Sequence, residues 1–203
     1  MAGQEKTDVG IMGHHTYPDP APMWSAIPGW FDFQQVYQEL AGRAQDGDVF
    51  VEIGCYLGRS GCFFGDALRT TGKRVTLLCV DVWPAQFDFQ DGSGTVIEAP
   101  FETFLANVRQ CRLTKIIVPL RCESLRAAQF VTNNLAAVFI DGEHDYDNCK
   151  ADIAAWMPKV RQGGILAGHD FSATFPGVEK AVREAFGDNI RVIGQSWLHD
   201  KPA

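Results

Sequence analysis

The chain has 203 residues, of which 46% are hydrophobic, 11% aromatic and 21% charged, and its formal net charge is -7. This composition is typical of one soluble globular domain, because a chain of this length buries about 70% of its unfolded surface. The negative charge argues against nucleic acid or an anionic membrane as the main partner, since either selects a basic surface. We therefore expect a small-molecule ligand. Without a leader-like or membrane-length apolar segment, we also expect a cytoplasmic location.

Residues 1–30 are predicted to form an irregular N-terminal arm ahead of a domain that spans 31–203. The arm is rich in Gly and Pro, but its apolar residues between Met23 and Trp30 are too many for a solvated tail. We expect the arm to pack over the domain or over a partner subunit, and the sequence leaves open whether the chain forms a homo-oligomer. The pair His14 and His15 is interpreted as solvent-exposed, with metal or substrate contact as the alternative.

The stretch VFVEIGCYLGRS, residues 49–60, predicts a buried strand, a tight turn and the start of a helix. Gly54 and Gly58 let the backbone turn sharply and approach a ligand, because neither carries a Cβ. Ser60 is predicted to cap the following helix, whose N-terminal N–H groups favour an electronegative partner. The turn is therefore typical of a nucleotide-binding site.

The spacing of this turn narrows the choice of nucleotide. Gly54-x-x-x-Gly58 lacks the third glycine of a dinucleotide fingerprint, and no P-loop lysine follows. Glu52 precedes the turn, where a carboxylate would repel a pyrophosphate and attract an ammonium. The pattern Glu-x-Gly-x-x-x-Gly after an apolar strand resembles motif I of the class I methyltransferases that use S-adenosylmethionine (SAM). The resemblance implies SAM as the cofactor, with Glu52 by its methionine end. Arg59 is predicted either to orient substrate or to lie at the surface.

Apolar runs and helical periodicities alternate along the chain and indicate a single α/β domain with a Rossmann-like, doubly wound, mostly parallel sheet. The expected helices span 32–44, 60–71, 100–110, 125–133, 146–157 and 178–186, and the expected strands span 49–53, 75–81, 115–120, 136–141 and 163–170, with one strand or a hairpin over 190–198. Residues 83–100 are expected to form a loop beside the cofactor, and a lid is one hypothesis for it. Phe130 is expected to face inward, and Gly163 to lie in a turn before the fifth strand.

Several predicted strands end in polar residues that suit a cofactor. Asp81 follows the second strand, where open α/β sheets place the acid that binds ribose hydroxyls. Glu123 and Ser124 follow the third strand, and the family resemblance implies that one of them approaches the adenine amine; helix capping by Ser124 is the alternative. The predicted cofactor-binding residues are Glu52, Gly54, Tyr56, Gly58, Ser60, Asp81, Glu123, Ser124 and Asp141.

Acids and imidazoles follow two further strands, which are expected to be neighbours in the sheet. Asp141 and His144 come after one, and His169 and Asp170 after the other. Their side chains would converge at the carboxyl edge of the sheet, beside the cofactor. Two carboxylates with an imidazole suit a divalent cation such as Mg²⁺, so the predicted metal ligands are Asp141, His169 and Asp170.

The motifs around these residues, DGxHxY from Asp141 and GGxxxxHDF ending at 171, resemble a branch of small-molecule O-methyltransferases that includes metal-dependent enzymes acting on macrolide sugars. The resemblance implies a metal on Asp141 and the pair His169-Asp170, although the metal-dependent relatives have a carboxylate in place of His169. It also implies His144 as general base, a role that suits an imidazole with a pKa near ~6.5.

We therefore expect O-methylation of a small hydroxylated molecule, with His144 and Asp141 as the catalytic residues. The alternative is a structural role, in which His144 and His169 only hydrogen-bond to the loop backbone. Three other functions stay open: a SAM-binding protein without methyl transfer, an NAD-dependent oxidoreductase, and a metal-dependent hydrolase.

Overall fold

The computed structural model describes residues 23–88 and 96–202. Its strands are β1 (Val49–Ile53), β2 (Thr76–Asp81), β3 (Gln86–Asp88), β4 (Val96–Glu98), β5 (Ile117–Arg121), β6 (Leu135–Ile140), β7 (Val160–Gly168), β8 (Arg191–Ile193) and β9 (Ser196–Asp200). Its helices are α1 (Gln34–Gly42), α2 (Arg59–Thr70), α3 (Pro100–Gln110), α4 (Ser124–Phe130), α5 (Tyr146–Trp156) and α6 (Pro176–Phe186), with 3₁₀ turns η1 (Met23–Ala26) and η2 (Met157–Lys159). The interpretation of His14 and His15 lies outside the described residues.

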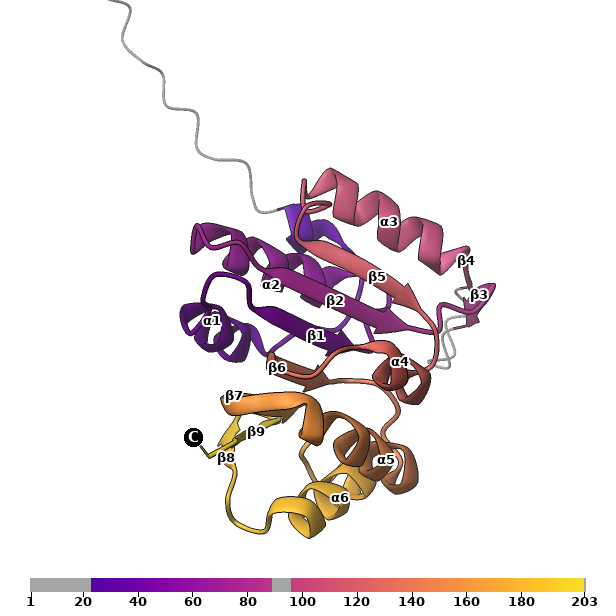
Figure 1. The fold of residues 1–203 in the computed structure, drawn as a ribbon. Coiled ribbons are helices and arrows are strands. Elements are labelled where there is room, and N and C mark those ends of the chain that lie inside the picture. Colours follow the sequence, from indigo (N-terminus) through magenta and orange to yellow (C-terminus); the bar gives the residue numbers. More distant parts are fainter. Residues whose placement is uncertain (1–22, 89–95, 203) are drawn as a thin grey trace, which may run out of the picture.

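In the described part of the chain, seven strands form one sheet in the order β5-β2-β1-β6-β7-β9-β8 (Figure 1). The first five of these strands are parallel, and β9 and β8 close one side as an antiparallel hairpin. The predicted doubly wound, mostly parallel sheet is confirmed, and β6 and β7 are neighbours as expected. The order changes direction at β1, so the carboxyl ends of β1, β2 and β6 meet at the crevice where such sheets bind ligands.

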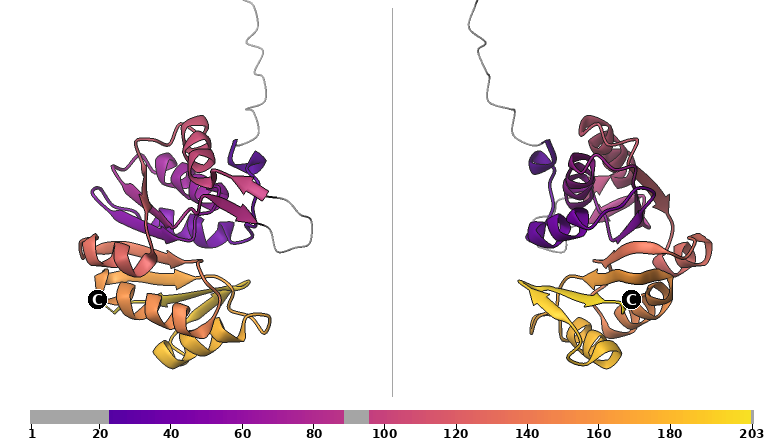
Figure 2. Two further views of the ribbon diagram at one scale, coloured as in Figure 1. Left: turned by 90° about the vertical axis from the view of Figure 1, so that its right-hand side faces the viewer. Right: turned by 60° about the vertical axis from the view of Figure 1, so that its left-hand side comes forward.

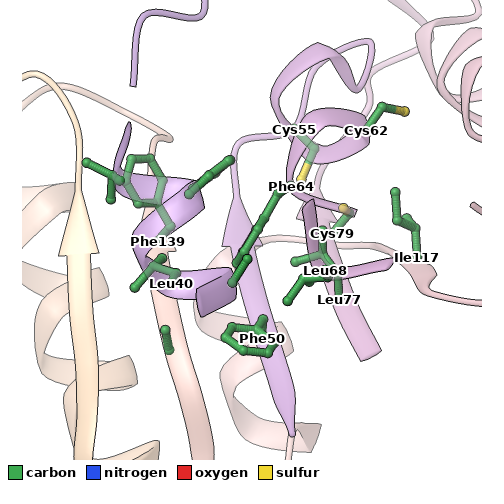
Figure 3. Packing of buried hydrophobic residues seen from close by; sticks show 14 of the residues in the cluster. Leu40, Phe50, Cys55, Cys62, Phe64, Leu68, Leu77, Cys79, Ile117 and Phe139 are labelled. Carbon is green, nitrogen blue, oxygen red and sulfur yellow. The ribbon is translucent and has the colours of Figure 1, made fainter. Parts of the chain in front are cut away.

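Helices cover both faces of the sheet, as the near-continuous apolar strands predict. One buried cluster joins the sheet to α1, α2 and α3, and a second joins it to α4, α5 and α6. Figure 3 shows the first cluster, where Phe50 of β1 and Leu77 of β2 pack against Phe64 and Leu68 of α2. On the second face, α5 and α6 lie side by side (Figures 1 and 2). Both faces of the central strands are thus excluded from water.

Three local expectations were wrong. Phe130 does not face inward: it is 73% exposed, because α4 ends at this residue and its buried face consists of Ala127 and Ala128. The turn expected at Gly163 does not precede the strand, because β7 already begins at Val160, and an irregularity in its pairing with β6 takes up the extra residues. The 83–100 segment is not a plain loop, because it contains the β3–β4 hairpin, which stands apart from the main sheet (Figure 2). The expectations for 89–95 lie outside the described residues.

The described end of the N-terminal arm packs on the domain, as predicted. Ile27 is buried, and the ring of Trp24 packs edge-on against Phe31 and Phe63. The remainder of the predicted arm, residues 1–22, lies outside the described residues. All six cysteines are free thiols, four of them buried. None of the described helices combines the length and the apolar character needed to span a membrane.

Candidate functional site

A cavity of about 1210 Å³ opens at the carboxyl ends of the parallel strands. Its wall is built from the residues that follow β1, β2, β5, β6 and β7, from the start of α4 and from the segment 29–33. Most of the predicted site residues line it: Gly54, Tyr56, Ser60, Asp81, Glu123, Ser124, Asp141, His144, His169 and Asp170. Glu52 and Gly58 do not. The predicted strand-end residues therefore line one cavity, with Glu52 and Gly58 as the two exceptions.

Glu52 lies beneath the cavity, in the core, which differs from the ligand contact that the sequence predicted. Its side chain is 0% exposed and points to the face of β1 that α1 and α2 cover, the same face as Phe50. The hydroxyl of Tyr37 donates to it at 2.8 Å, and Ser60 also hydrogen-bonds to it. Burial raises the pKa of Glu52, and these hydrogen bonds only partly offset the effect. Glu52 is thus a structural carboxyl that ties α1 and α2 to β1.

The β1–α2 turn depends on its two glycines, but Ser60 does not cap the helix. Gly58 is the N-cap residue, without a side-chain cap, and Ser60 lies inside α2 with its hydroxyl engaged by Glu52. Gly54 has a φ of +83°, and a Cβ added there would lie 1.9 Å from the carbonyl oxygen of Asp141. Glycine at this position therefore lets the β1–α2 turn touch the β6–α5 turn across the floor of the cavity.

Asp81 organises the same turn from β2. Its Oδ2 accepts the backbone N–H groups of Cys55 and Tyr56, both at 2.9 Å, and its Oδ1 accepts that of Trp83 at 2.8 Å. A carboxylate has about four lone-pair positions, so about one remains for a ligand. Asp81 thus holds the turn in place and still offers an acceptor to the cavity.

Glu123 and Ser124, the two candidates after β5, differ in how much of their hydrogen-bonding capacity is free for a ligand. The hydroxyl of Ser124 donates its one hydrogen to Asp152 and accepts from the indole of Trp156 at 2.9 Å, so a single lone pair remains for a ligand. The alternative that Ser124 caps α4 is wrong, because the N-cap residue is Glu123 and the Ser124 side chain bonds to α5 instead. Glu123 is exposed in the cavity wall, with its carboxylate making no cap bond.

The acids and imidazoles after β6 and β7 meet as predicted. The Nε2 atom of His144 hydrogen-bonds to Oδ2 of Asp170 at 2.9 Å, and Nδ1 of His169 lies 3.3 Å from the other oxygen. Asp170 adopts a φ of +59°, a left-handed conformation that Asp tolerates better than most residues and that brings its carboxylate between the two rings. His169 also lies 3.9 Å from Asp141. The alternative that both histidines only bond loop backbone is therefore wrong.

The pKa shifts follow from this arrangement. Burial raises the pKa of Asp141 to about 7. The hydrogen bond to Asp170 raises the pKa of His144. Burial lowers the pKa of His169, but its bond to Asp170 and the nearby carboxylates outweigh burial, so the net shift is upward. Asp170 shows the converse: burial is opposed by hydrogen bonds from both rings, which hold its pKa well below the usual range. Such opposed shifts are typical of functional sites.

The set of atoms that could share one cation differs from the predicted set. Ligand atoms of Asp141, His144 and Asp170 lie within 4.8 Å of one another. His169 is outside this set, because it turns towards Asp170 on one side and lies 2.9 Å from Asp32 on the other. The imidazole of His169 thus lies between Asp170, after β7, and Asp32 of the segment 29–33.

Sequence reasoning missed Asp32 and left Arg59 undecided. Asp32 reaches the site because the segment 29–33 folds across the strand ends, and no local pattern signals this contact. Arg59 is partly buried in the wall, and its Nη1 donates to the carbonyl of Gly29 at 2.8 Å. Trp30, also in the wall, is 71% exposed.

Residues 51–171, more than half of the chain, match the model of a family described as a methyltransferase domain. The chain belongs to this methyltransferase family. No curated protein sequence that was compared matches it. Within the methyltransferase, the matched range runs from β1 to the residue after Asp170 and so contains the turn, the strand ends and the histidine pair.

Solved structures share the fold of this methyltransferase. The O-methyltransferase NovP is 18% identical, with a TM-score of 0.66 over 84% of this chain and 79% of its own. CalS11, a TDP-rhamnose 3'-O-methyltransferase of calicheamicin biosynthesis, is 17% identical, with a TM-score of 0.57 over 82% and 76%. Cofactor-bound Rv0187 from MTB is 15% identical, with a TM-score of 0.63 over 89% and 87%. At these identities the likeness shows a common fold.

Proposed function

We propose that this methyltransferase transfers a methyl group from SAM to a hydroxyl oxygen of a small molecule. The observation that carries the proposal is the hydrogen-bonded pair of His144 and Asp170, beside Asp141, in the wall of a cavity that also holds the β1–α2 turn. A base fixed in such a wall suits removal of a proton from a hydroxyl group. The names of NovP and CalS11, both O-methyltransferases, support oxygen as the accepting atom.

The lining residues fit the chemical groups of SAM. A cavity of about 1210 Å³ exceeds the roughly 300–1,000 Å³ of ordinary ligand pockets, so it has room for a nucleoside and an acceptor together. The remaining lone pair of Asp81 suits a ribose hydroxyl, and the carboxylate of Glu123 suits the exocyclic amine of adenine. The methionine end would then pass over Gly54 and Tyr56 towards Asp141.

SAM supplies a methyl group on a positively charged sulfur, open to in-line attack by an oxygen nucleophile. Because Nε2 of His144 bonds to Asp170, Nδ1 is the ring nitrogen that accepts the proton of the acceptor hydroxyl. Asp170 stays ionised and stabilises the imidazolium that forms, since its two hydrogen bonds keep its pKa low. We assign Asp141 to orienting the acceptor hydroxyl towards His144.

A divalent cation is a second way to lower the pKa of the hydroxyl. The close ligand atoms of Asp141, His144 and Asp170 favour this candidate. A cation bound to all three would replace the hydrogen bond between His144 and Asp170, so His144 would no longer be the base. The two mechanisms therefore make opposite predictions for the effect of chelators.

Calorimetric titration with SAM and S-adenosylhomocysteine (SAH), followed by SAH release in the presence of a panel of hydroxylated acceptors, tests the proposal. We expect binding of both compounds and turnover that His144→Gln abolishes. Turnover that survives EDTA supports the base mechanism, whereas turnover restored only by Mg²⁺ supports the cation. Binding of SAM without turnover on any acceptor would favour a SAM-binding protein. Absence of binding by the wild-type protein refutes the proposed function.

A further inference from the structure

The cavity is strongly acidic, and Arg59 is the exception. Its wall carries seven carboxyl groups, those of Asp32, Asp81, Glu123, Asp141, Glu143, Asp152 and Asp170. Arg59 is the only lysine or arginine among the lining residues that the structure describes. The two imidazoles of the wall, His144 and His169, are already paired with Asp170. An anionic group of a ligand would therefore be repelled along most of the wall and attracted at Arg59.

The guanidinium of Arg59 has bonding capacity left. Its Nη1 donates to the carbonyl oxygen of Gly29, which is neutral. Its Nε is buried and has no hydrogen-bond partner among the described residues, and Arg59 makes no ion pair with any of them. An unpaired N–H of a charged group is costly to bury, and a planar guanidinium is best satisfied by a carboxylate that it can bind at two points.

The position of Arg59 in the fold indicates which anionic group would reach it. Arg59 is the first residue of α2, next to Tyr56 and Ser60 in the wall, so it belongs to the turn after β1. In the sheet β1 lies between β2, which carries Asp81, and β6, which precedes Asp141. A SAM molecule with its ribose at Asp81 and its methyl group near Asp141 has its amino-acid end over this turn.

We propose that Arg59 binds the α-carboxylate of SAM and thereby makes the methyltransferase selective for the intact amino-acid end of the cofactor. This inference rests on the proposed function. The carboxylate pairs with the positive charge of the guanidinium, and the bond from Nη1 to Gly29 holds the guanidinium against the segment 29–33. Arg59 is therefore a cofactor-binding residue that also connects this segment to α2.

The test compares two probes by calorimetry on the full chain: SAH and its decarboxylated analogue, S-(5'-adenosyl)-3-thiopropylamine. Because a hydrogen bond to a charged group is worth roughly ten- to a hundredfold in affinity, wild type should bind SAH tighter by about that factor. Arg59→Met, which keeps the aliphatic stem, should reduce the ratio of the two affinities to about twofold by weakening the binding of SAH alone.

Two further variants serve as comparisons. Arg59→Lys, which keeps the charge, should give an intermediate ratio of the two affinities. Arg109→Met, an exposed position on α3, is the matched control and should leave both affinities unchanged.

The outcomes distinguish failure of this inference alone from failure of the proposed function. Equal affinity of wild type for the two probes overturns the role of Arg59 and leaves SAM binding established. Equal weakening of both probes in Arg59→Met also overturns it, since that result means a structural role through Gly29. Unchanged binding of both probes with a raised KM for the acceptor would assign the guanidinium to the acceptor instead. Absence of binding of SAH to wild type refutes the proposed function and this inference together.

Discussion

Replacing Glu52 by Ala removes the acceptor for two buried hydroxyl groups, those of Tyr37 and Ser60. A buried hydroxyl without a partner costs about 1–3 kcal/mol, so the substitution should lower the free energy of unfolding by about 2–6 kcal/mol. Glu52→Gln keeps one carbonyl oxygen for Tyr37 and leaves one hydroxyl without an acceptor, so a loss of about 1–3 kcal/mol is expected. Because Glu52 lies beneath the cavity, neither change should remove a ligand contact.

The assay is urea unfolding at several pH values, combined with calorimetry of SAH binding. Since the pKa of Glu52 is raised in the folded state, its contribution to stability is present at low pH and is lost as the pH rises through the folded-state pKa. Glu52→Gln should therefore lack this fall in stability with rising pH. Glu102→Gln, an exposed change on α3, is the control.

Ligand affinity is the result that could refute this reasoning. We expect the SAH dissociation constant of Glu52→Gln to stay within about threefold of wild type, which is less than 1 kcal/mol. A loss of tenfold or more with an unchanged free energy of unfolding would mean that Glu52 contacts the ligand directly. The burial of Glu52 would then not describe the ligand-bound protein.

Three further changes test the rest of the site. His144→Gln should lower kcat by about 10²–10⁴-fold with SAH affinity unchanged, and a loss below tenfold would exclude His144 as the base. Asp170→Asn removes the negative charge that helps to raise the pKa of His144, so the rising limb of the pH–rate profile should move to lower pH; an unmoved limb contradicts the pairing. Gly54→Ala should cost more than about 3 kcal/mol in urea unfolding, because its Cβ would meet the Asp141 carbonyl at 1.9 Å. Gly72→Ala, also at positive φ but with open space around it, should cost only about 1–2 kcal/mol.

The sequence was enough to predict the sheet and the edge where the site lies. Strands buried on both faces appear as continuous apolar runs, and β6, buried at all of its positions, is the clearest case. Once the strands are parallel, the residues that follow them gather at one edge whatever the details of packing. Asp81, Asp141 and the pair His169-Asp170 could therefore be placed in one cavity from their order in the chain.

Only the tertiary structure decided where individual side chains point and which partners they meet. Both faces of β1 are buried, so the sequence could not tell that Glu52 turns towards α2 and not to the cavity beyond the strand end. Ser60 lies inside α2, not at its cap, and its hydroxyl bonds to this same carboxyl. Asp32 becomes part of the site because the segment 29–33 folds over the strand ends, where Gly29 of the same segment also accepts a bond from Arg59. Local patterns record burial and turns, whereas contacts between residues distant in the chain arise only when the elements pack.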